Sequence, residues 1–187
     1  MKRKTAKEIL AESFRELAQS MPIDKITVKD IIGNCGYSQA TFYRQFRDKY
    51  DLIAWSYTRD LEQILDRLNG DAQSWRKTLV EVARYYQQHR QYLANLLTHT
   101  NGYDSFVVNM TAIHQKILLK TLERLSGSKA LDENSQIYGR IYCYGTVLFS
   151  CDWILGKYSL SEKELAAVYE NALPAPLAHY IRQKREK

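Results

Sequence analysis

Polar side chains that can read nucleic-acid bases are concentrated in one short segment of this 187-residue chain. Gln39, Arg44 and Gln45 carry amide or guanidinium groups, which can form paired hydrogen bonds with the edges of adenine or guanine. The methyl groups of Ala40 and Thr41 can pack on the methyl group of thymine. Together, these residue types predict contact with the major groove of double-stranded DNA.

Groups suited to phosphate surround this segment. Thr41, Tyr43 and Lys49 carry hydroxyl or ammonium groups, which commonly bond to phosphate oxygens. Helices that begin just after Thr27 and Ser38 would also direct backbone N–H groups toward a phosphate. The full set of predicted DNA-contacting residues is Thr27, Lys29, Ser38, Gln39, Ala40, Thr41, Tyr43, Arg44, Gln45 and Lys49.

Two short helices are needed to present this segment to DNA. Thr27 with Asp30 three residues later is typical of a capping box, so a helix should begin there. Gly36 should end that helix in the left-handed conformation, and Ser38 is a good cap for the next. The pattern predicts a helix-turn-helix, whose second helix enters a groove about 12 Å wide while the first braces it.

The second helix needs one face in the core and one face free. Phe42 and Phe46 are four residues apart and therefore share a face, which should anchor the helix. The side chains left on the outward face or beside it are Ala40, Thr41, Tyr43, Arg44 and Gln45. A glycine turn between short helices is also common in proteins that do not bind DNA, and geometry alone leaves that alternative open.

The charge distribution supports a polyanionic partner only weakly. Residues 1–50 contain ten Lys and Arg against six Asp and Glu, whereas residues 51–187 contain 17 against 15. A local basic excess suits contact with DNA, but a charged face that merely keeps the protein in solution would look the same.

The whole chain predicts an all-α protein in two parts. Residues 1–50 should form a three-helix, homeodomain-like module, with its first helix at about 5–21, and residues 51–187 a helical bundle. A helix over 51–68 should connect them. Apolar periodicity and glycine or proline breaks predict further helices at about 74–89, 92–97, 103–126, 135–156 and 161–172, followed by a basic segment.

Aromatic residues are frequent in the second part, since the chain has 14 tyrosines. Such rings can line an apolar ligand cavity that has a few hydroxyl partners. The candidates for this pocket are Tyr85, Tyr86, Tyr103, Phe106, Tyr142 and Phe149. The alternative is an aromatic-rich core or interface, where tyrosine is also favoured.

A second apolar region could hold two copies of the chain together. The segment 137–155 is apolar nearly all round, which predicts a helix buried on several sides. The candidates for a dimer interface are Ile137, Ile141, Gly145, Leu148, Leu165 and Tyr169. The alternative is an ordinary core within one chain.

Other classes of protein are disfavoured. Cys35, Cys143 and Cys151 form no CxxC pair, and the histidines have no metal-ligand spacing, so we expect reduced thiols, no metal and no cofactor. The apolar run 141–155 is shorter than the roughly 20 residues that a membrane span needs, and no signal peptide is evident. We expect a cytoplasmic protein. An enzyme is disfavoured because no phosphate-binding loop or nucleophile elbow appears.

Residues 27–32, 35–38 and 41–52 resemble the signature of the tetracycline-repressor (TetR) family. That signature has a threonine at the start of the second helix, a glycine turn and a T-[FL]-Y-x-[HY]-F-x-[DNS]-K-x-x-L run, which here begins at Thr41. Two departures are Gln45, where His or Tyr is common, and Met21-Pro22 in place of a common glycine. The run from Asp48 to Leu52, with Trp55, also resembles the dihydroxyacetone-kinase-regulator subgroup.

The resemblance implies a homodimer that binds a palindromic DNA operator, usually as a repressor, and a small effector that binds the second part and releases the DNA. It also implies that residues 51–187 are the ligand-binding and dimerisation domain, with the 51–68 helix as the lever between ligand and DNA. Some members of the subgroup act instead as coactivators with a partner protein. The leading hypothesis is therefore a ligand-responsive repressor, and the alternative is a coactivator or adaptor that works through a protein partner.

Overall fold

The computed structural model describes residues 4–65, 72–102, 105–127 and 130–182, and within these ranges the regular structure is entirely helical. This confirms the all-α prediction. The helices are α1 (Ala6–Leu17), α2 (Val28–Cys35), α3 (Gln39–Gln45), α4 (Lys49–Leu65), α5 (Ala72–Gln88), α6 (Arg90–Thr98), α7 (Phe106–Leu125), α8 (Glu133–Ile154), α9 (Glu162–Asn171) and α10 (Ala175–Arg182), with a 3-10 turn at Ile23–Lys25.

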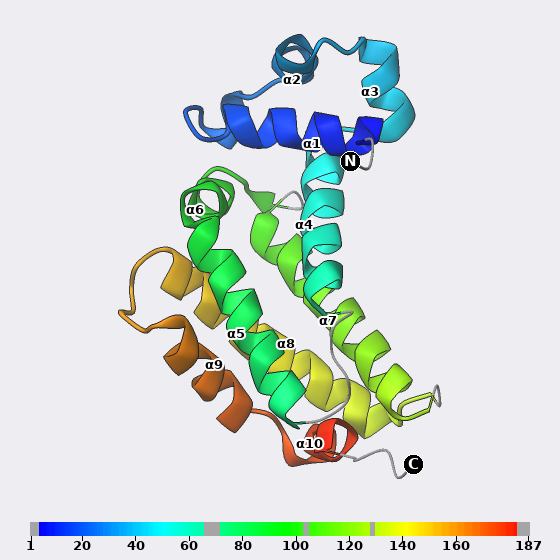
Figure 1. The fold of residues 1–187 in the computed structure, drawn as a ribbon, viewed down its shortest axis with the longest axis vertical. Helices are drawn as coiled ribbons and strands as arrows, with labels where there is room; N and C mark the ends of the chain where they lie inside the picture. The colour runs from blue at the N-terminus through cyan, green and yellow to red at the C-terminus, as the bar shows by residue number, and fades with distance from the viewer. Residues whose placement is uncertain (1–3, 66–71, 103–104, 128–129, 183–187) are drawn as a thin grey trace.

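Helices α1 to α3 form a small head at one end of the molecule (Figure 1). Its apolar side chains are fully buried between the three helices and the 3-10 turn, and they are Leu10, Phe14, Ile23, Ile26, Ile31 and Phe42. Helix α1 crosses the start of α4, which then runs down into the rest of the chain (Figure 1). The head is therefore carried on the end of α4.

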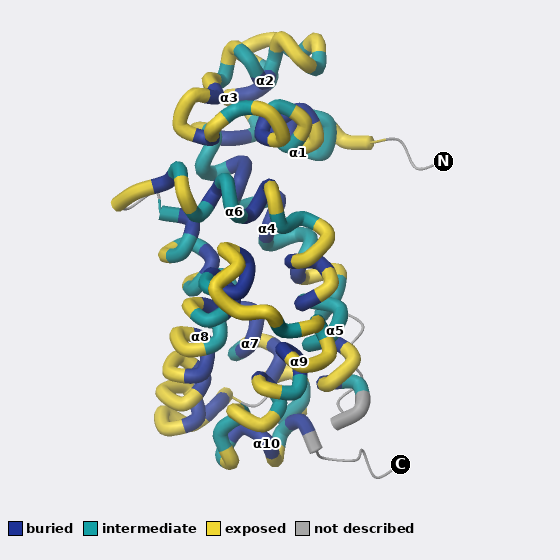
Figure 2. Tube along the Cα trace, turned by 90° about the vertical axis from the view of Figure 1, so that its left-hand side faces the viewer, coloured by how far each residue is buried: buried dark blue, intermediate teal, exposed yellow. Residues whose placement is uncertain are grey.

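Helices α4 to α10 form the body. Helix α5 packs against α9, and α7 packs against α8. The α7–α8 approach is close at Gly139, where an added Cβ would lie 3.1 Å from Leu119 Cδ2. In Figure 2, buried positions face the centre of the body, while one side of α8 is exposed along most of its length.

Helix α10 differs from the sequence prediction, which ended the last helix near residue 172; α10 follows Pro174 and contains Pro176 in its first turn. Proline is tolerated in the first turn of a helix, where its missing N–H would have no helical partner in any case. The carbonyl of Pro174 accepts hydrogen bonds from the N–H groups of Leu177 and Ala178. Leu177 and Ile181 are buried in a second apolar cluster, which explains why the segment folds.

The apolar run 141–155 forms the last part of α8 and its C-cap Leu155, and α8 packs against other helices of the body. Among the described residues, none of the helices has the length and apolar character that crossing a membrane requires.

Candidate DNA-binding surface and interior cavity

The turn between α2 and α3 has the predicted local geometry. The N–H of Asp30 donates to Thr27 Oγ1 at 3.3 Å, and the Asp30 carboxylate accepts the N–H of Thr27 at 2.8 Å, so the capping box is complete. Hydrogen bonds from the hydroxyl and N–H of Thr27 lower the pKa of the Asp30 carboxyl. Gly36 has φ 73°, which a residue with a side chain rarely adopts.

Helix α3 presents a polar face to solvent. Ser38 caps the helix by accepting the N–H of Thr41 at 3.2 Å, while Phe42 and Phe46 are buried in the head. The exposed members of the predicted set are Thr27, Lys29, Ser38, Gln39, Ala40, Tyr43 and Arg44, and Thr41 and Gln45 are partly exposed. Most of them lie at the outer end of the head, where most residues are coloured as exposed in Figure 2.

The ammonium group of Lys49 is bonded within the protein, whereas a contact with a DNA phosphate would need a free N–H donor. Its Nζ donates to the carbonyl oxygens of Ile23 at 2.8 Å, Asp24 at 3.1 Å and Ile26 at 2.8 Å. An ammonium group has three donors, so these bonds use all of them. Burial lowers the pKa of Lys49. The side chain ties the start of α4 to the loop between α1 and α2.

The head is joined to the body by polar contacts between distant parts of the sequence. Arg15 of α1 forms an ion pair with Asp60 of α4 and donates to Ser56 Oγ at 2.7 Å. The same Asp60 carboxylate accepts the hydroxyl of Tyr85 at 3.1 Å. Arg59 forms an ion pair with Glu8. None of these pairs was predicted, because each needs two helices to be brought together from positions more than 20 residues apart.

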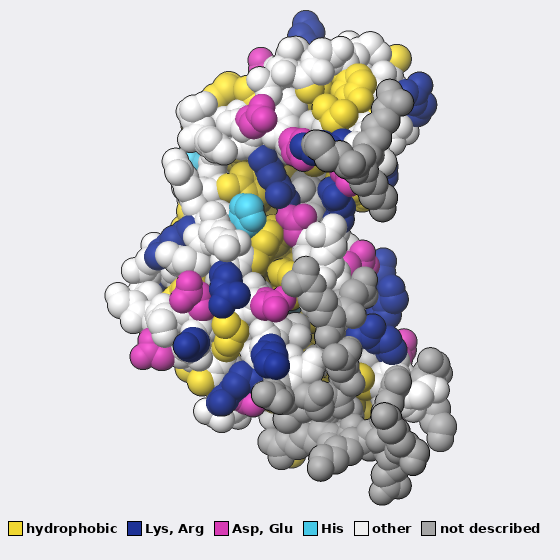
Figure 3. Space-filling model, in the orientation of Figure 1, with side chains coloured by type: hydrophobic (Ala, Val, Ile, Leu, Met, Phe, Trp, Pro, Cys, Tyr) yellow, Lys and Arg dark blue, Asp and Glu magenta, His cyan; other side chains and the backbone are white. Residues whose placement is uncertain are grey.

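The face seen in Figure 3 carries basic and acidic side chains that are interspersed over the head and the body. This agrees with the small basic excess of the first 50 residues. The shape and polar groups of α3, more than a strong positive field, therefore distinguish the head.

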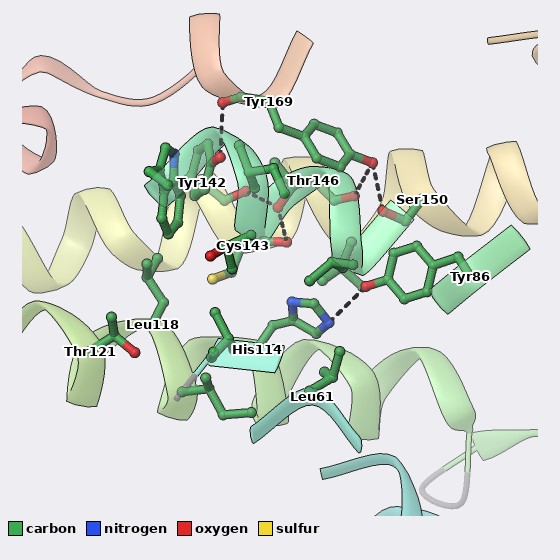
Figure 4. Close-up of a pocket in the computed structure, with 17 residues that line it drawn as sticks. Leu61, Tyr86, His114, Leu118, Thr121, Tyr142, Cys143, Thr146, Ser150 and Tyr169 are labelled. Atoms are coloured by element: carbon green, nitrogen blue, oxygen red, sulfur yellow. Dashed lines mark hydrogen bonds between the residues drawn. The ribbon is translucent and has the colours of Figure 1, made fainter. Parts of the chain in front are cut away.

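A cavity of about 70 Å³ lies inside the body (Figure 4). It is lined by Leu61, Leu65, Trp75, Thr78, Leu79, Val82, Tyr86, His114, Ile117, Leu118, Thr121, Tyr142, Cys143, Thr146, Val147, Ser150 and Tyr169. The walls come from α4, α5, α7, α8 and α9. Helix α4, which carries the head, is therefore also a wall of the cavity.

Three polar groups meet at one side of this cavity. His114 Nε2 lies 2.8 Å from the hydroxyl of Tyr57 and 3.0 Å from that of Tyr86, and the two hydroxyls are 3.2 Å apart. Burial lowers the pKa of His114 to about 4 and raises the pKa of both tyrosines. At neutral pH all three groups are therefore uncharged.

The structure brings together only part of the pocket that the sequence suggested. Tyr86 and Tyr142 line the cavity. Tyr85 bonds to Asp60 instead, Phe106 packs edge-to-face on Tyr57, and Phe149 stacks on Tyr158. The predicted Tyr103 lies outside the described residues. His114 was set aside because it has no metal-ligand spacing, and its role in the cavity wall had no signal in the sequence.

An apolar stripe is exposed on α8. Ile137, Ile141 and Leu148 are between 47% and 59% exposed, and Gly145 is exposed beside them. Tyr138 and Tyr144 extend the stripe. Leu165 and Tyr169, which the sequence placed in the same interface, are instead buried within this chain, because α9 turns them toward α5 and α8: the Tyr169 hydroxyl donates to the carbonyl of Thr146 at 3.0 Å.

No group of three or more potential metal ligands occurs among the described residues. Cys35, Cys143 and Cys151 are free thiols in the structure. Burial raises the pKa of Cys151 to about 11 and that of Cys143 to about 12, so both are protonated at neutral pH.

A helix-turn-helix head on an all-helical body with an interior cavity defines a class of DNA-binding transcription regulators. The chain belongs to the TetR family. Residues 9–54 match the model for "Bacterial regulatory proteins, tetR family", and residues 73–174 match that for "Transcriptional regulator C-terminal region". The resemblance to the family is thereby confirmed, and the protein is a DNA-binding transcription regulator.

Individual relatives are distant. The "HTH-type dhaKLM operon transcriptional activator DhaS" of Lactococcus lactis subsp. lactis (strain IL1403) is 24% identical over 99 residues, 53% of this chain and 52% of the relative. The matched segment thus spans about half the length of that curated relative.

Solved structures show the same fold over nearly the whole chain. A "Dihydroxyacetone kinase operon activator DhaS" has a TM-score of 0.64 at 18% identity and covers 92% of this chain and 96% of its own. The Thermus thermophilus FadR repressor, solved with lauroyl-CoA, has a TM-score of 0.61 at 14% identity and covers 97% and 98%. At these identities the likeness establishes the fold.

Proposed function

We propose that this protein is a homodimeric repressor that binds a palindromic operator and is released from it by a small effector bound in the body. The observation that carries the proposal is the placement of α4. Its first residue, Lys49, is bonded to the head, and its later residues Leu61 and Leu65 line the cavity. A single helix therefore connects the base-reading surface with the space for a ligand.

The outward face of α3 supports sequence-specific reading. Gln39 and Arg44 are exposed and carry groups that can bond to base edges, while Tyr43, 52% exposed, can reach a phosphate. Residues 1–50 are proposed as the reading module, and residues 51–187 as the ligand and dimer domain, with α4 as its lever.

The exposed stripe on α8 supports dimerisation. Large apolar side chains repeat along one face of a long helix, and a second copy would remove them from water. A two-fold dimer reads two half-sites one helical turn apart, about 34 Å, so the operator would be a palindrome. An effector could bind more tightly to a dimer whose heads have a different separation. It would then lower the affinity for the operator by the ratio of its own affinities for the two states.

Activation is a second candidate, and the curated relative favours it, because its name describes an activator. A version in which the chain acts through a protein partner is compatible with the small basic excess of the head. Both candidates predict an intact fold, and they differ in what the protein does at a promoter.

A salt-titrated gel shift on the DNA upstream of its own gene tests the DNA-binding part. We expect a sequence-selective shift that weakens steeply with salt and is lost with Arg44→Ala. Transcription from the shifted promoter, with purified polymerase, then separates the candidates, since repression lowers and activation raises the yield. If the chain alone gives no sequence-selective shift at low salt, the repressor hypothesis is wrong, and the hypothesis of a partner-dependent regulator remains.

A further inference from the structure

The cavity has an uncharged lining. None of the described residues that line it is Lys, Arg, Asp or Glu; nine of them are Leu, Ile, Val, Trp or Cys, and three are Tyr. Its hydroxyl groups are largely occupied within the protein: Thr146 Oγ1 donates to the carbonyl of Tyr142 at 2.8 Å, and Ser150 Oγ lies 2.6 Å from the Tyr169 hydroxyl. A charged ligand group would lose its hydration here without gaining an ionic partner.

Two lining residues are exceptions to this internal pairing. The Nε1–H of Trp75 has no hydrogen-bond partner among the described residues. The Nε2 of His114 faces the hydroxyls of Tyr57 and Tyr86, and none of the described residues bonds to His114 Nδ1. In Figure 4 one ring nitrogen points to Tyr86, and the other points toward the lining side chains from α8. One nitrogen therefore remains available to a molecule in the cavity.

The hydrogen bonds assign the proton on this ring. A neutral imidazole has one N–H donor and one acceptor nitrogen. Tyr57 and Tyr86 are both buried, and each has one hydroxyl hydrogen to place. If one hydroxyl donates to the other, the second needs an acceptor, and Nε2 is the acceptor within reach. The proton then resides on Nδ1, which offers an N–H donor to the cavity.

We propose that the effector of this regulator is a compact, uncharged and mainly apolar molecule with an oxygen acceptor, such as a ketone or ether oxygen, and that His114 Nδ1–H recognises this oxygen. The inference rests on the proposed function, because it specifies the ligand of the same cavity. It also links the ligand to the lever helix through the His114 ring, since Nε2 of this ring is bonded to Tyr57 of α4.

Size and charge separate this effector from a long acyl thioester such as the lauroyl-CoA bound by the Thermus thermophilus relative. The cavity volume of about 70 Å³ has room for several water molecules. The cavity wall offers no basic side chain to a phosphate among the described lining residues. A small neutral molecule fits both limits.

Three probes with the same four-atom skeleton test the ligand class on the full chain without DNA. Acetone has a neutral oxygen acceptor, 2-methylpropene has none, and acetate has a charged one. By NMR titration we expect acetone to bind at least about fivefold more tightly than 2-methylpropene, which is the contribution of a typical neutral hydrogen bond. We expect acetate to bind at least about tenfold more weakly than acetone. Acetate binding as tightly as acetone, or no binding by either neutral probe, would overturn the proposal.

The role of His114 is tested by His114→Phe, which keeps a ring in the wall and leaves Tyr57 and Tyr86 to bond to each other. We expect it to lose the preference for acetone over 2-methylpropene while 2-methylpropene binding stays. His179→Phe is the matched control, because it makes the same change at an exposed histidine of α10 that does not line the cavity, and its preference should equal that of the wild type.

Imidazole ¹⁵N spectra give a readout that depends on contact and not only on folding. The chain has four histidines, and the signal missing from His114→Phe identifies His114. Acetone should shift the Nδ1 signal of His114 in the wild type and in His179→Phe, and an unchanged signal in the presence of bound acetone would contradict the assignment. The gel shift tests the proposed function separately: DNA binding without any neutral probe binding refutes only this inference, and probe binding without DNA binding refutes only the proposed function.

Discussion

The side-chain oxygen of Asn95, in α6, accepts a hydrogen bond from the backbone N–H of Ile23, at the start of the 3-10 turn, at 3.1 Å. The amide nitrogen of the same side chain donates to the carbonyls of Ala18 and Met21, each at 2.8 Å. One residue of the body therefore satisfies three backbone groups where α1 ends and the loop to α2 begins. Asn95 thus fixes the head to α6, in addition to the connection through α4.

Replacing Asn95 with Ala should loosen this joint. Two carbonyls and one N–H would lose their partners, so we expect the free energy of unfolding to fall by about 1–3 kcal/mol. Urea denaturation at neutral pH measures the change. Gln91→Ala, one turn earlier in α6, is the control, because its amide makes a single exposed contact with the Gln19 carbonyl at 3.4 Å and should matter little. Equal, small losses for both variants would show that Asn95 does not hold the head.

Lys49 and Arg44 should separate stability from DNA contact. Lys49→Ala leaves three carbonyls of the loop without their donor, so we expect a lower melting temperature and a salt dependence of DNA binding close to that of the wild type. Arg44 is exposed on α3, and Arg44→Ala should preserve the melting temperature and weaken DNA binding. Thermal melts and salt-titrated binding on one operator measure both effects. The reverse pattern would return Lys49 to the phosphate-contacting set.

A charge on the α8 stripe should dissociate the proposed dimer. Ile141 is 59% exposed at the middle of the stripe, and Ile141→Lys would bring two ammonium groups into a two-fold interface. We expect a monomer by sedimentation and a loss of operator affinity. Val108→Lys is the control, because Val108 is an exposed apolar residue (56%) on α7, away from the stripe, and should leave the mass unchanged. A wild-type monomer, or a dimer that survives Ile141→Lys, would place the interface elsewhere.

Acid should destabilise the protein partly through His114. Burial lowers its pKa from the usual 6.5 to about 4 in the folded chain, so between these pH values the unfolded chain binds a proton that the folded chain does not. This contribution to stability is complete above pH 6.5 and is lost as the pH falls to about 4. By the shift in pKa it amounts to about 2–3 kcal/mol.

Comparison with His114→Phe isolates this contribution from the carboxylates, which also titrate near pH 4. The difference in unfolding free energy between wild type and variant should change by that amount between pH 7 and pH 4, with the wild type losing more. A constant difference across this range would mean that His114 keeps its ordinary pKa.

The sequence by itself determined the local structure of the head. Thr27, Gly36 and Ser38 act on their own neighbours through caps and a left-handed turn, and Phe42 with Phe46 defines one face of a helix by spacing alone. Such short-range rules need no knowledge of the rest of the chain. These rules were enough to predict the helix-turn-helix, the all-α fold class and the resemblance to the family.

Only the tertiary structure decided which residues surround the cavity and which join the head to the body. His114 meets Tyr57 and Tyr86 from separate helices, and Asn95 reaches a loop more than 70 residues away along the chain. The same holds for Lys49, whose ammonium bonds to the carbonyls of a loop, and for Tyr169, which α9 turns inward. Burial and pairing of this kind depend on how helices pack, and periodicity specifies which residues share a face but not what that face meets.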